Sequence, residues 1–71
     1  MLNWTCPAGN EWCADGDGML VIRASRAGFR VLDQNARRYV GCYAALPHAI
    51  EAAEAHMRRA DPAMYAYLIG A

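Results

Sequence analysis

The sequence predicts an α+β fold in which a three-stranded antiparallel sheet packs on one α-helix, followed by a short C-terminal helix. Short apolar runs with period-two alternation, separated by tight turns, predict a β-meander over residues 19–44. Pro47 and an apolar period of 3.6 residues then predict a helix over 47–60. A further proline ends that helix and favours a short second helix over 62–69.

The length of the chain limits what it can be. Its 71 residues form at most one domain, residues 1–71, and a domain of this size buries only about 60% of its unfolded surface. A deep substrate cavity is therefore not expected. The formal net charge is zero, but residues 19–46 contain five arginines and a single carboxylate. This basic middle segment favours contacts with phosphate or carboxylate groups.

The first part of the chain, residues 1–18, is rich in glycine, proline, asparagine and aspartate, which predicts an irregular N-terminal arm with turns. Within it, "ADGDG" (14–18) is interpreted as a turn. Trp4 and Trp12 are too large to be left in solvent without reason. We therefore expect at least one of them to cover the sheet edge or the core.

The predicted strands cover 19–25, 29–35 and 38–44, and their alternation assigns side chains to two faces. The face toward the helix holds Leu20, Ile22, Ala24, Phe29, Val31, Val40 and Cys42. The open face holds Arg23, Ser25, Arg30, Gln34, Tyr39 and Tyr43. The predicted core consists of Ile22, Phe29, Val31, Val40, Ile50, Ala53 and Met57. Arginine and tyrosine are enriched in binding hot spots, so the open face is the expected working surface.

The stretch "YVGCYAALPHAIEAA" (39–53) resembles the Apetala-type, or ethylene-response-factor, DNA-binding domain, and the similar three-strand-plus-helix domains of integrases. That family ends its third strand in Trp-Leu-Gly-x-Phe and begins an alanine-rich helix soon after. The matching residues here are Tyr39, Val40, Gly41, Tyr43 and Ala49. The resemblance implies contacts with double-stranded DNA from the open sheet face, through Arg23, Arg30, Arg37 and Tyr39.

Motifs that carry chemistry are not evident. The candidate metal ligands are Cys6, Cys13, Cys42, His48 and His56, but structural zinc sites open with two ligands at C-x₂₋₄-C spacing, which these cysteines lack. The sequence leaves open whether Cys6 and Cys13 are paired. Phosphate-binding, zinc-protease and nucleophile-elbow motifs are absent. We therefore expect no metal, no cofactor and no enzymatic activity.

The chain is accordingly predicted to be a small binding protein that docks on a larger protein or nucleoprotein complex and blocks or adapts it, like phage or mobile-element inhibitors of the anti-CRISPR type. A double-stranded DNA-binding module is the alternative, and a homodimer formed through a strand edge is a third. The predicted partner-binding residues are Arg23, Arg30, Arg37, Arg38, Tyr39 and Tyr43. No membrane span or secretory signal is evident, so a cytoplasmic location is expected.

Overall fold

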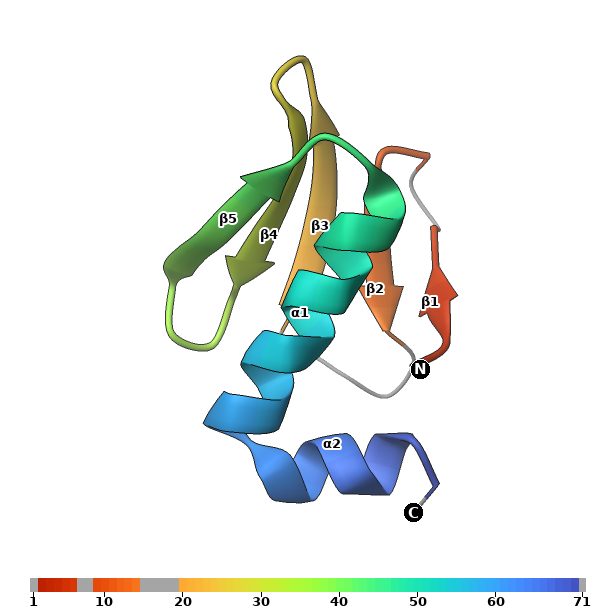
Figure 1. The fold of residues 1–71 in the computed structure, drawn as a ribbon, viewed down its shortest axis with the longest axis vertical. Helices are drawn as coiled ribbons and strands as arrows, with labels where there is room; N and C mark the ends of the chain where they lie inside the picture. Colours follow the sequence, from red (N-terminus) through yellow and green to blue (C-terminus); the bar gives the residue numbers. More distant parts are fainter. Residues whose placement is uncertain (1, 7–8, 15–19, 71) are drawn as a thin grey trace.

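The structure is a computed structural model that describes residues 2–6, 9–14 and 20–70. Its elements are β1 (Trp4–Thr5), β2 (Glu11–Ala14), β3 (Leu20–Ser25), β4 (Gly28–Asp33), β5 (Arg38–Tyr43), α1 (Leu46–Ala60) and α2 (Pro62–Leu68). The five strands form one antiparallel sheet in chain order. Helix α1 lies across one face of the sheet, against β3, β4 and β5, and α2 packs on α1 (Figure 1).

The predicted α+β class with an antiparallel sheet is confirmed, but the prediction of three strands is wrong. The segment predicted to be an irregular arm contains β1 and β2, which extend the sheet to five strands. Both strands are short, at two and four residues. Such strands give little local signal, because their stability comes from pairing in the sheet, β1 with β2 and β2 with β3. The predicted turn at 14–18 lies, apart from Ala14, outside the described residues.

The hairpin between β3 and β4 depends on Gly28. Its φ of +128° lies in the region that favours glycine. A Cβ atom at this position would also stand 2.5 Å from the backbone oxygen of Tyr43 on the neighbouring strand. Any other residue would therefore strain the backbone and push β5 away from β4 at this end of the sheet.

A β-bulge interrupts the pairing of β4 with β5. Val31 lies opposite Gly41, and Leu32 lies opposite Tyr39, so Val40 has no partner of its own on β4. Side chains alternate between the two faces of a strand, and one inserted residue reverses every later side chain. The bulge therefore decides which residues of β5 face α1.

Two of the predicted face assignments are wrong because of this bulge. Cys42, predicted to face the helix, lies opposite Arg30 on the open face. Tyr43, predicted to lie on the open face, lies opposite Phe29 and packs against the core under α1. The alternation expected from the sequence holds as far as Val40, which packs on the core as predicted, and is reversed from Gly41 onward.

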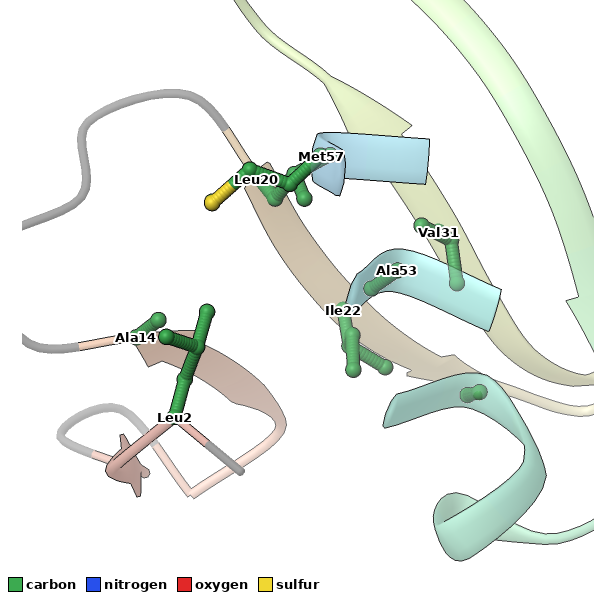
Figure 2. Packing of buried hydrophobic residues seen from close by; sticks show 8 residues of the cluster. Leu2, Ala14, Leu20, Ile22, Val31, Ala53 and Met57 are labelled. Atoms are coloured by element: carbon green, nitrogen blue, oxygen red, sulfur yellow. The ribbon is translucent and has the colours of Figure 1, made fainter. Parts of the chain in front are cut away.

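The core lies between α1 and the sheet and gathers side chains from both ends of the chain (Figure 2). Its buried members are Leu2, Ala14, Leu20, Ile22, Val31, Ala49, Ala53 and Met57. Four of the seven predicted core residues are among them, while Phe29, Val40 and Ile50 are half-buried against the cluster. Both tryptophans also pack on it, and the rings of Trp12 and Phe29 meet edge-on with centroids 5.6 Å apart.

One charged side chain of α1, Glu54, is buried beside this core, with 7% of its surface exposed. Its Oε2 accepts hydrogen bonds from the backbone N–H of Leu2 at 3.0 Å and from Trp4 Nε1 at 2.9 Å. Its Oε1 accepts a hydrogen bond from the hydroxyl of Tyr65 at 3.1 Å. The carboxylate thus ties the N-terminal segment and α2 to α1.

We predict that Glu54→Ala lowers the free energy of unfolding by about 3 kcal/mol or more, because three donors lose their acceptor and each such loss costs about 1–3 kcal/mol. Chemical denaturation monitored by circular dichroism measures the change. Tyr65→Phe should cost much less in the Glu54→Ala background than in the unaltered chain, because the two groups share one hydrogen bond. Additive effects of the two substitutions would contradict this role of Glu54.

We also predict that Met57→Ala costs about 2–5 kcal/mol of stability, because its side chain is fully buried and the change opens a cavity. Ile50 lies on the half-buried side of the same helix, so Ile50→Ala should cost less than Met57→Ala. Thermal unfolding of the two variants compares them directly. An equal or larger loss for Ile50→Ala would show that the helix packs on a different side.

Candidate partner-binding surface

The sheet face opposite α1 carries two rows of side chains across the strands. The first row contains Thr5, Cys13, Val21, Leu32 and Tyr39. The second contains Glu11, Arg23, Arg30 and Cys42. No helix of the described residues contacts this face, since α1 lies on the other side and α2 packs only on α1. We call it the open face.

Two of the predicted binding residues, Arg23 and Arg30, stand directly opposite each other in the second row. Like charges in such cross-strand positions destabilise a sheet. Glu11, next to Arg23 on β2, offsets this repulsion. Its Oε2 accepts a hydrogen bond from Arg23 Nε at 2.9 Å and lies 2.8 Å from Nη2 in an ion pair with the same guanidinium. The charge of Arg23 is therefore balanced within the chain, whereas Arg30 has no acidic partner among the described residues.

The turn between β4 and β5 presents two further predicted residues, Arg37 and Arg38. Asp33 begins this turn, and its Oδ1 accepts a hydrogen bond from the backbone N–H of Ala36 at 3.0 Å. Arg37 then takes a φ of 53°, in the left-handed region that costs a non-glycine residue about 1–2 kcal/mol. Arg38 starts β5 opposite Asp33. The turn thus holds two adjacent arginines at one end of the sheet.

These residues surround a hollow of about 460 Å³ beside the first row. Its lining consists of Leu32, Asp33, Gln34, Arg37, Arg38 and Tyr39. Tyr39 is 59% exposed, and its ring borders the hollow together with the apolar side chain of Leu32. Arg30 lies two residues before Leu32, on the same face of β4. The hollow is therefore an apolar and aromatic centre with arginines at its rim.

The structure brings together some of the predicted binding residues and separates others. Arg37, Arg38 and Tyr39 line one hollow, and Arg30 lies close by on the same face. Arg23 lies one strand further away, in its ion pair with Glu11. Tyr43 lies on the opposite face of the sheet.

Leu32 and Glu11 were missed as parts of this surface. The alternation of β4 could have identified Leu32, because the strand neighbour of an inward-facing Val31 must face outward. The ion pair of Glu11 could not be found in this way, since β2 itself was not predicted.

A contact between Asp33 and His56 fixes the turn to α1 behind this surface. Asp33 is 3% exposed, and its Oδ2 lies 2.8 Å from Nε2 of His56. Burial alone would raise the pKa of Asp33, but the N–H of Ala36 and the side chain of His56 outweigh it. The pKa therefore lies below its ordinary value of 3.8. The charged form of Asp33 is thus favoured by the fold, and it anchors the base of the turn.

No disulfide, metal-binding cluster or membrane-spanning helix occurs among the described residues. Cys6, Cys13 and Cys42 are free thiols, which answers the question of pairing left open by the sequence. Among residues 2–6, 9–14 and 20–70, no three His, Cys, Asp or Glu side chains gather in a way that could hold a metal ion. None of the helices in this described part is long and apolar enough to span a membrane.

Comparisons of the chain with protein-family models, with curated proteins and with solved structures found no match. We therefore interpret the open face from its own geometry.

The lowered pKa of Asp33 predicts how stability depends on pH. Because the folded pKa lies below the unfolded value of 3.8, this group stabilises the fold fully above that pH. The stabilisation is lost as the pH falls through 3.8 toward the folded pKa. Urea unfolding between about pH 5 and about pH 3 should show a steeper loss of stability for the unaltered chain than for Asp33→Asn. Parallel pH dependences would contradict this prediction.

Proposed function

We propose that this chain is a small non-catalytic binding protein that docks on a larger protein through its open face. The observation that carries this proposal is the hollow between Leu32 and the exposed Tyr39, with Arg37 and Arg38 at its rim. Interface centres are enriched in tyrosine and arginine and are bounded by polar groups. The arrangement of this hollow matches that composition.

The charge distribution favours a protein over duplex DNA as the partner. Phosphate neutralisation supplies most non-specific DNA affinity and needs several cations along one face. On the open face, Arg23 is paired with Glu11. The arginines of this face without an ion pair to a described residue are Arg30, Arg37 and Arg38, and they are gathered at one end of the face instead of lying along it. The net charge of the chain is zero. Mixed charges around an apolar centre suit a protein surface better than a phosphate backbone.

The size of the molecule is consistent with a docking interface that takes up most of one of its faces. An interface of standard size buries about 800 Å² on each partner. The accessible surface of this chain is 4504 Å², so such an interface would take less than a fifth of it. A contact of that extent needs most of one face and can cover a site on the partner. Blocking or adapting a larger complex, as phage or mobile-element inhibitors of the anti-CRISPR type do, is therefore the proposed role.

Site-specific photo-crosslinking tests the proposal. We predict that p-benzoylphenylalanine at position 39 forms one discrete adduct with a protein in cells that contain the chain naturally, and that nuclease treatment leaves the adduct intact. The same amino acid in place of Tyr67 is the matched control, because Tyr67 is 78% exposed and lies on α2, away from the open face. Equal labelling from both positions, or an adduct that nuclease removes, would overturn the proposal.

Substitutions then separate binding from folding. We predict that Tyr39→Ala and Arg30→Ala each change stability by about 0.5 kcal/mol or less, since both side chains are exposed. Affinity for the crosslinked partner should fall by about 2 kcal/mol if Tyr39 is a hot spot. Titrations with random duplex DNA at several salt concentrations complete the test. A DNA-binding face would show a fall in the logarithm of the affinity, with the logarithm of the salt concentration, of about 0.9 per phosphate contacted. A protein-binding face should show no such salt-dependent binding of DNA.

A further inference from the structure

A second surface lies on the other side of β5, in the corner between this strand and α1. Two hollows follow each other there, one at each end of β5. The first, of about 320 Å³, is lined by Tyr43, His48, Glu51, Ala52 and Ala55. The second, of about 260 Å³, is lined by Arg38, Tyr39, Val40, His56 and Arg59. We call this surface the β5–α1 groove.

The first hollow is predominantly apolar because small residues of α1 face an aromatic ring. Ala52 and Ala55 leave space where longer side chains would fill the corner, and Tyr43 forms the opposite wall. The ring of Tyr43 lies against Gly41: a Cβ atom there would stand 2.7 Å from the tyrosine Oη. The glycine thus allows the ring to lie over the strand, and the hollow is wide enough for one apolar side chain.

The second hollow is cationic. Arg38 and Arg59 line it from β5 and α1, and neither makes an ion pair with a described residue. His56 also lines it, and its Nε2 is held by the buried Asp33. The neighbouring Arg58 is turned away, with its guanidinium 5.5 Å from the ring centre of Tyr65. Two arginines without an ion pair to a described residue therefore line one small space.

The spacing of the hollows fits an extended chain. Ala52 and Arg59 lie seven residues apart on one side of α1, which is about 10 Å along the helix axis. An extended peptide covers this distance in about three residues, at about 3.3 Å each. Figure 1 shows β5 at the outer margin of the sheet, where β4 is its only partner among the described strands. Its other edge is available for pairing with an added strand.

From this arrangement we propose that the β5–α1 groove binds an extended peptide segment of a partner protein. The segment places a carboxylate side chain between Arg38 and Arg59, and an apolar side chain about three residues away between Tyr43 and Ala52. Guanidinium groups pair with carboxylates through two parallel hydrogen bonds, which fixes the position of the acidic residue. This second site shares Arg38 and Tyr39 with the open face. It is nevertheless a distinct site, because Leu32 and Arg30 do not line the groove.

Selection from a random nonapeptide display library against the immobilised full-length chain tests the proposal. The expected result is enrichment of peptides with an aspartate or glutamate about three positions from a large apolar residue. In the double variant Arg38→Glu/Arg59→Glu, the preference of the selected peptides for an acidic residue should switch to lysine or arginine, because the charge of the second hollow is reversed. In the double variant Ala52→Leu/Ala55→Leu, the first hollow is filled. The selected peptides should then keep the acidic residue and lose the preference for a large apolar residue.

Matched controls separate these effects from general ones. Ala60→Leu adds the same side chain to an exposed position at the end of α1, and Arg26→Glu reverses a charge in the exposed turn between β3 and β4. Both should select the same peptides as the unaltered chain. Leu32→Ala should likewise leave peptide selection unchanged while weakening the protein crosslink at position 39, so the two proposals fail or hold separately.

A measurement on the unaltered chain makes the test independent of how the variants fold. In the unaltered chain, binding of a selected peptide should shift the backbone NMR signals of Ala52, Ala55 and Arg59. In a separate titration, Arg59→Gln should weaken the affinity for the same peptide by about tenfold. The proposal is overturned if no peptide is enriched, if the shifts fall elsewhere, or if the double glutamate variant selects the same peptides. Binding of duplex DNA that depends on Arg38 and Arg59, without peptide selection, would also overturn it.

Discussion

The fold depends on one buried carboxylate. A charged group in a small apolar core destabilises the protein unless its oxygens are fully hydrogen-bonded. Glu54 meets this condition only when the N-terminal segment and α2 both reach it, through Leu2, Trp4 and Tyr65. These hydrogen bonds to Glu54 hold the first residues of the chain against α1. They thereby keep β1 and β2 beside β3, where their pairing extends the sheet and brings Leu2 and Ala14 into the core.

The sheet then separates two surfaces of different chemistry. The open face offers Leu32 and Tyr39 with surrounding charges, and the β5–α1 groove offers an apolar hollow and a cationic one. Arg38 and Tyr39 line hollows on both surfaces, so they form the border between them. The buried pair of Asp33 and His56 fixes this border, because it joins the end of β4 to α1 just below the turn. A partner large enough to cross the edge of β5 could contact both surfaces at once.

Local signals in the sequence determined a large part of this architecture. Pro47, the apolar period of 3.6 residues and Pro62 mark the two helices, and the turn glycine marks the β3–β4 hairpin. Arg37, Arg38 and Tyr39 are adjacent in the sequence, at the start of a strand, so their gathering at one end of the sheet follows from chain connectivity. The open sheet face also follows, since one helix of this length covers one face only.

Tertiary structure alone decided the rest. The bulge at Val40 reversed Cys42 and Tyr43, because the register of a strand depends on its partner and one unpaired residue exchanges the two faces. The same reversal placed Tyr43 in the β5–α1 groove, which the sequence did not predict. The buried role of Glu54, and with it the anchoring of the N-terminal segment to α1, depends on contacts across about 50 residues of chain. A local pattern carries no information about such contacts, because each exists only when the distant parts have already come together.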